Sequence, residues 1–215
     1  MNILKREDPQ TILNILNKKQ SILVMKQAPK NGEGCWWYLY CGEGDYLTFE
    51  YVSVDNTLRT DYPWCYQVVK KLRNDEYVRH TKPLNGKVVA RFWCDKVEGI
   101  LNDFNTKYNV AVCSTVSLFH FEILDKSCLQ QNQLTKYLEN KNGYAIHISK
   151  LEIFDRPREL NEFYKVGFNK ALEDFEKEIE TLIDNHQPHP ISFYSVQKQY
   201  EITKAPQNYC YVEGE

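Results

Sequence analysis

The pattern of hydrophobic and polar positions predicts strands separated by short helices. Runs of β-branched and aromatic residues bounded by glycine, proline or asparagine are typical of strands. The clearest are the aromatic run CWWYLYC and the run KVVARFWCDKV, which follows an Asn-Gly turn. The predicted strands cover residues 21–26, 35–41, 46–54, 87–97, 110–122, 144–149, 151–154, 191–196 and 209–212.

Helical spacing is clearest near the C-terminus. Phe168, Leu172 and Phe175 begin an apolar stripe on a segment whose other face is acidic. Such a stripe usually packs on its own domain. It also suits an interface with another protein, so we hypothesise that a partner protein docks on helix 168–185. The predicted helices cover residues 9–16, 66–72, 129–139, 158–164 and 168–182. Strands with a few short helices predict an α+β protein, consistent with a barrel that has helices at its ends.

Length and composition predict one globular domain, residues 1–215. The chain has 215 residues, 42% of them hydrophobic, and no run approaches the roughly 18 apolar residues of a membrane span. The opening MNILKREDPQ has no apolar segment of the kind that signal peptides carry. We therefore expect no contact with a membrane and a cytoplasmic location.

The cysteines and histidines predict neither a metal site nor a cofactor. The seven cysteines are an odd number and form no CxxC pair, which argues against a disulfide framework and a zinc ribbon. His186 and His189 are interleaved with prolines and have no third ligand nearby in sequence, so a surface turn is favoured. Sequence motifs for phosphate loops, serine hydrolases and zincins are absent.

Charge is unevenly distributed on a chain whose net charge is only −2. Residues 16–30 carry four lysines and no acid, and all four tryptophans precede residue 95. Lysines beside exposed aromatic rings are typical of surfaces that bind single-stranded nucleic acid. A solvated face and a filled core give the same composition, so both interpretations stay open. In the pair Trp36-Trp37 one ring must face each side of the sheet.

His147 lies in the middle of a predicted strand. Alternation places it on the face of Ala145 and Ser149, opposite Ile146 and Ile148. A hydrogen-bonded structural histidine is one interpretation, and contact with a ligand or a proton-transfer role is the other.

Four blocks of the sequence resemble ASCH-domain proteins, especially the version found in phages and Firmicutes. Residues 84–97, LNGKVVARFWCDKV, resemble the strand G-K-V-(I/V)-(G/A)-x-F-x-C-D of that family. Residues 143–164 are similar to its YAxHISxLxIYDxPxELxEFY block, and residues 204–213 to its PPQSWCYVE terminus. Residues 21–30 look like its first strand and turn. The blocks leave residues 42–83 and 166–203 as predicted insertions.

The resemblance implies a PUA-like mixed β-barrel with a cleft for RNA or a modified nucleobase. Some family members are ribonucleases or amidohydrolases that deacylate N4-acetylcytidine, with the signature G-x-K-x-x-(E/T)-x-R. Its four anchors fall here on Lys18, Gln20, Leu23 and Met25, and none matches. A shift of one residue matches Lys19 alone, because Ile22 and Val24 then take the other polar positions. The resemblance therefore implies binding with a degraded catalytic motif.

Three functions follow as hypotheses. The first is a non-catalytic module that binds nucleic acid, RNA in particular, in which lysines contact phosphates and a tryptophan stacks on a base. The second is a hydrolase of nucleobases or RNA that uses Lys19 or Lys26 with Ser21 and His147. The third is a phage-borne protein-interaction module. The predicted nucleic-acid-binding residues are Lys18, Lys19, Gln20, Ser21, Lys26, Lys30, Trp37, Trp93 and His147.

Overall fold

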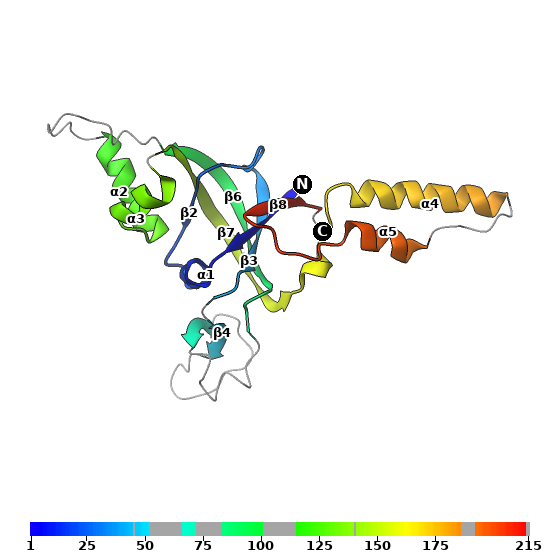
Figure 1. Cartoon of the computed structure of the whole chain (residues 1–215), viewed down its shortest axis with the longest axis horizontal. Helices are drawn as coiled ribbons and strands as arrows, with labels where there is room; N and C mark the ends of the chain where they lie inside the picture. The colour runs from blue at the N-terminus through cyan, green and yellow to red at the C-terminus, as the bar shows by residue number, and fades with distance from the viewer. Residues whose placement is uncertain are drawn as a thin grey trace.

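The protein is a mixed α+β structure built on one six-stranded sheet, as the computed structural model shows (Figure 1). The structure describes residues 1–44, 46–51, 66–71, 83–100, 115–139, 141–185 and 192–213. The strands of the six-stranded sheet are β1 (Asn2–Glu7), β2 (Ile22–Met25), β3 (Cys35–Cys41), β6 (Val88–Ile100), β7 (Gly143–Arg158) and β8 (Tyr209–Val212).

The sheet is open. Its strand order is β2-β7-β6-β3-β1-β8, with β1 parallel to β3 and every other pair antiparallel. Among the described residues β2 pairs only with β7, so its second edge has no strand beside it. The predicted α+β class is confirmed, but the strands do not close into a barrel because β8 and β2 do not pair.

Helices cover the sheet from both faces. Helix α1 (Pro9–Leu16) packs on the inner face, where Ile12 and Ile15 join a core with Trp37 and Phe92. Asp8 caps this helix by accepting hydrogen bonds from the backbone N–H groups of Gln10 (2.9 Å) and Thr11 (3.1 Å). Helices α2 (Thr115–Ser127) and α3 (Gln131–Leu138) pack on the outer face of β2 and β7.

Two peripheral pairs of elements lie in the segments that the sequence predicts to be insertions. Strands β4 (Tyr46–Tyr51) and β5 (Tyr66–Lys71) form a separate antiparallel pair. Helices α4 (Phe168–Asp184) and α5 (Phe193–Tyr200) extend away from the sheet at the end opposite α2 and α3 (Figure 1). A partner protein for this helical pair stays a prediction.

The sequence analysis missed β1 and misassigned three other elements. Val68 and Val69, predicted as helix, lie in β5, in agreement with the strand preference of β-branched residues. Residues 115–122, predicted as strand, belong to α2, whose Ile123 is buried against Ile22 of β2. Residues 193–196, also predicted as strand, begin α5, where Ser192 accepts a hydrogen bond from the backbone N–H of Ser195.

Two further observations concern the cysteines and the helices of the described chain. The five described cysteines are free. No described helix is long and apolar enough to span a membrane. Cys65, Cys113, His186 and His189 lie outside the described residues.

Candidate functional site

A pocket of about 390 Å³ lies beside the unpaired edge of β2. Its walls come from the end of β1 and the first turns of α1, from β2 itself, and from the junction of α2 and α3. Most of the lining residues carry polar side chains, and Leu23 of the inner core lies among them. The polar lining residues include Glu7, Asp8, Asn14, Gln20, Ser127 and Tyr137.

The register of β2 turns its backbone polar groups toward this pocket. The carbonyl of Ser21 accepts a hydrogen bond from the N–H of Ile148 in β7 (2.9 Å). Because alternate residues of an antiparallel ladder bond to the same neighbour, the N–H and C=O groups of Ile22 and Val24 point to the free edge. The Nε2 of Gln20 donates to the Ile22 carbonyl (2.9 Å) and so satisfies one of them.

Gln20 is the predicted site residue that the structure places in the pocket wall. Its side chain is buried, with the residue only 7% exposed. The Ile22 carbonyl needs a donor, so the amide nitrogen is fixed on that side and the Oε1 oxygen is turned the other way. In the described part of the chain no group donates to this oxygen, and a buried acceptor without a donor costs free energy until a ligand supplies one.

Glu7 contributes a second buried acceptor to the same pocket. Its Oε1 lies 2.7 Å from the Nζ of Lys5, and the two side chains are 14% and 6% exposed. Lys5 also donates to the Arg6 carbonyl (2.8 Å). Burial raises the pKa of Glu7, and its effect exceeds the opposing attraction of Lys5. No described residue donates to the Glu7 Oε2 oxygen.

Asp8 is already occupied by the start of α1. Both of its oxygens accept hydrogen bonds, one from the backbone of Gln10 and Thr11 and the other from the Thr11 hydroxyl (2.7 Å). Glu7, rather than Asp8, is therefore the carboxylate with capacity for a ligand.

Two of the predicted lysines flank the pocket, one at each end of β2. Lys19 is exposed, and its carbonyl accepts a hydrogen bond from the thiol of Cys128 (3.1 Å), which lines the pocket. Lys26 forms an exposed ion pair with Glu139 (2.5 Å) and lies 5.7 Å from the ring centroid of Tyr137, another lining residue. The pocket thus has acceptors inside, the Lys26 cation at its rim, and the backbone of exposed Lys19 in contact with its wall.

The remaining predicted polar residues of this segment lie outside the pocket lining. Lys18 is exposed in the turn after α1, and Ser21 is exposed with its backbone N–H donating to the Lys126 carbonyl (2.8 Å). Lys30 is exposed near the other edge of the sheet, where its carbonyl accepts from the Tyr211 hydroxyl (2.9 Å). The structure does not group these three with Gln20 around one cavity.

The prediction that Trp37 stacks on a base is wrong. The residue is 0% exposed, its indole N–H donates to the Gly32 carbonyl (2.9 Å), and its ring stacks on Phe92. Trp93 is half-buried in an edge-to-face contact with Trp36, at a centroid distance of 5.5 Å. The guanidinium of Arg91 lies over the Trp36 ring at 4.4 Å.

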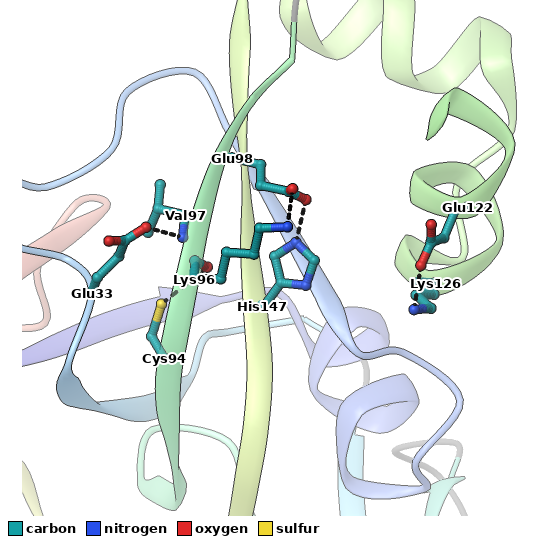
Figure 2. Close-up of polar contacts among 8 residues, drawn as sticks. All are labelled: Glu33, Cys94, Lys96, Val97, Glu98, Glu122, Lys126 and His147. Carbon is teal, nitrogen blue, oxygen red and sulfur yellow. Dashed lines mark hydrogen bonds and ion pairs between the residues drawn. The ribbon is translucent and has the colours of Figure 1, made fainter. Parts of the chain in front are cut away.

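His147 lies in a second polar cluster, on the outer face of β6 and β7 (Figure 2). Its Nε2 lies 2.7 Å from Oε2 of Glu98, whose Oε1 is paired with Lys96. Burial by itself would raise the pKa of Glu98, but hydrogen bonds from Lys96 and His147 outweigh burial and lower this pKa. Across from them on α2, Lys126 bonds to Glu122 and lowers the pKa of that carboxylate. Each carboxylate of this cluster has a partner, in contrast to the Oε2 of Glu7.

Other surface features fit a ligand less well. A hollow on α3 is lined by residues of that helix and its C-terminal cap alone and has no facing wall. Within the described residues, no three His, Cys, Asp or Glu side chains are grouped to hold a metal ion.

The solved structures that this chain is similar to are ASCH proteins. The crystal structure of ASCH from Zymomonas mobilis aligns with a TM-score of 0.48 and 8% identity, over 99% of this chain and 87% of that one. A serine-to-alanine variant of that protein aligns with a TM-score of 0.47 and 9% identity, over 99% of this chain and 88% of that one. A tyrosine-to-phenylalanine variant aligns with a TM-score of 0.42 and 9% identity, over 92% of this chain and 94% of that one. No family model and no curated protein matches this chain. Identities this low say nothing about function, which is argued below from the pocket.

Sequence reasoning missed Lys5, Glu7 and Tyr137. The alternation Ile3-x-Lys5-x-Glu7 was a signal for β1, because it places three side chains on one face of a strand. The burial of the Lys5–Glu7 pair, and the place of Glu7 in the same pocket lining as Gln20, depend on the pairing of β1 with β3 and β8.

Proposed function

We propose that this chain is a non-catalytic nucleic-acid-binding protein that binds single-stranded RNA and takes one base into the pocket beside β2. The observation that carries the proposal is the pocket itself, with acceptors that lack donors inside, Lys26 at its rim, and exposed Lys19 joined to its wall through the backbone carbonyl. Its volume of about 390 Å³ falls in the lower part of the range for small-ligand sites, roughly 300–1,000 Å³. Sequence-specific RNA recognition commonly uses an unstacked base read on its polar edge.

The two rim lysines provide the contacts to phosphate. Both are exposed, and a phosphate can compete for Lys26 because an exposed ion pair such as Lys26–Glu139 contributes only about 0–1 kcal/mol. The ring of Tyr137, which is 44% exposed and lines the pocket, supplies a surface on which a base can stack. The site therefore combines stacking, edge recognition and charge.

The residues at the ASCH anchor positions support binding without catalysis. Gln20 has an amide that neither loses nor gains a proton near neutral pH. Leu23 and Met25 are 2% and 1% exposed and belong to the inner core. A hydrocarbon or thioether side chain has no proton to transfer and cannot attack a carbonyl or phosphate.

The substitutions Lys19→Ala and Lys26→Ala, combined, should weaken RNA binding about tenfold or more near 0.1 M salt. Each lysine that neutralises a phosphate also contributes to the salt dependence, so the slope of log K against log salt should become about one to two units less steep. Fluorescence anisotropy with a labelled single-stranded RNA, repeated over a salt series, measures both quantities.

The matched control is Lys170→Ala with Lys177→Ala, which removes two exposed lysines of α4 far along the chain from the pocket. This pair has the same change in net charge and should leave affinity and salt slope within about twofold of the parent. Equal losses in both double variants would mean that only overall charge matters and would reject the pocket as the site.

The cluster around His147 favours hydrolysis as the second candidate function. A histidine held by Glu98 and flanked by Lys96 has the groups of a general base and a cationic stabiliser. Under the proposed binding function we expect no turnover of N4-acetylcytidine or of single-stranded RNA. Incubation of each compound with the protein, with chromatography of the mixture, measures any product. Turnover that His147→Ala abolishes, while the variant keeps the parent's thermal transition, would establish the hydrolase instead.

A further inference from the structure

We propose that the pocket beside β2 selects guanine, a base that presents two adjacent hydrogen-bond donors, to the buried acceptors of Glu7 and Gln20. This inference rests on the proposed function and names the base that the same pocket takes. Some polar atoms of the pocket already have hydrogen-bond partners and others do not, and this difference specifies the ligand.

Two acceptor oxygens of the pocket lack a donor among the described residues. The Oε1 of Gln20 has no donor in the described chain, because its amide nitrogen is held by the Ile22 carbonyl. Among the same described residues the Oε2 of Glu7 has none either, since Lys5 pairs with Oε1. Both residues line the one pocket, and both side chains are largely removed from water. A ligand that leaves them without donors would have to bear the full cost of desolvation.

The polar edges of the four bases differ in how they meet two acceptors. Guanine presents its N1–H and its N2 amino group side by side. Adenine and cytosine each have one amino group next to a ring nitrogen that is itself an acceptor, and uracil has a single N–H between two carbonyls. Only guanine meets both acceptors without placing another acceptor against a carboxylate.

The rest of the pocket suits the same base. The backbone N–H of Val24 points to the free edge of β2 and is available to the O6 carbonyl of guanine. Tyr137 provides a ring face in the same lining, and Lys26 lies beside that ring, where a 5′-phosphate would gain from its charge. Asp8 does not compete for the base, because its oxygens cap α1.

The first test changes only the ligand. Titration calorimetry of the unmodified protein with the 5′-monophosphates of guanosine, inosine, adenosine and cytidine should rank guanosine first. Inosine keeps N1–H and lacks the N2 amino group, so it should bind about tenfold more weakly, and adenosine weaker still. The same series in a single-stranded oligoribonucleotide, with the variable base at one position, distinguishes a free nucleotide from an RNA base as the source of the guanine.

The second test changes the protein. In the proposed complex the guanine N2 amino group lies at Glu7 and N1–H lies at Gln20. In Glu7→Gln the remaining oxygen stays on Lys5 and the amide NH2 group faces the guanine N2, so the preference for guanosine over inosine should disappear. Glu152→Gln is the matched control, since Glu152 is an exposed glutamate paired with Arg91 on β6 and does not line the pocket. A circular dichroism melt of each variant shows whether it is folded.

The outcomes separate this inference from the proposed function. Guanosine preference that Glu7→Gln removes and Glu152→Gln retains supports both. RNA binding that is sensitive to Lys19 and Lys26 but indifferent to the base overturns the guanine inference and leaves the binding function in place. A protein that binds neither the nucleotides nor the oligonucleotide overturns both.

Discussion

Trp37→Ala should lower the free energy of unfolding by about 3–5 kcal/mol, the range for removing a large aromatic side chain from a core. The indole is completely buried, stacks on Phe92 at a centroid distance of 5.7 Å, and donates to the Gly32 carbonyl. Alanine would leave a cavity in the inner core, and the Gly32 carbonyl would keep only the weaker donor, the Cys35 thiol at 3.4 Å. Urea unfolding followed by circular dichroism measures the loss.

Two companion variants separate stability from ligand binding. Trp37→Phe keeps most of the ring and loses the hydrogen bond, so it should cost about 1 kcal/mol and leave RNA affinity unchanged. Trp93→Ala removes a half-buried ring that contacts Trp36 and should be less destabilising than Trp37→Ala. If Trp37→Phe weakened RNA binding about tenfold without a change in stability, the assignment of Trp37 to the core alone would be incorrect.

Lys5→Met should destabilise the fold by about 3–5 kcal/mol at pH 7, because it leaves the buried Glu7 carboxylate without its cation. The deficit should depend on pH. The folded-state pKa of Glu7 lies above the ordinary value of 4.5, so its stabilising effect is complete below pH 4.5 and is lost as pH rises through the folded pKa. Removing Lys5 raises that pKa further, so the deficit should be small near pH 4 and grow toward pH 7.

A second substitution tests the cause. Glu7→Leu added to Lys5→Met replaces the whole ion pair by apolar groups and should recover most of the lost stability at pH 7, because a buried pair contributes little over a packed apolar pair. Urea unfolding at pH 4, 5.5 and 7 gives the comparison. A Lys5→Met deficit that is the same at all three values would contradict a buried ion pair at this position.

The sequence predicted most of the binding residues close to the short strand β2, and the structure brings only part of that set to the pocket. Lys19, Gln20 and Lys26 flank or line the pocket because they lie immediately before and after β2, so proximity in sequence carried the prediction. Trp37 was misplaced because an aromatic strand fits a core and a stacking surface equally well. His147 was placed on the polar face, and the structure adds its partner Glu98 from a neighbouring strand.

The segments that sequence alone determined are those with strong local signals. Aromatic and β-branched runs specified β3 and β6, and Asp8 with Pro9 specified the start of α1, since caps and alternation act over a few residues. Tertiary structure alone decided that α2 is helical, that the sheet stays open at β2, that the side chains of Lys5 and Glu7 are largely buried, and that Glu7 lines the same pocket as Gln20. These features depend on contacts between residues distant in sequence, whose packing energies exceed local preferences of at most about 1 kcal/mol per residue.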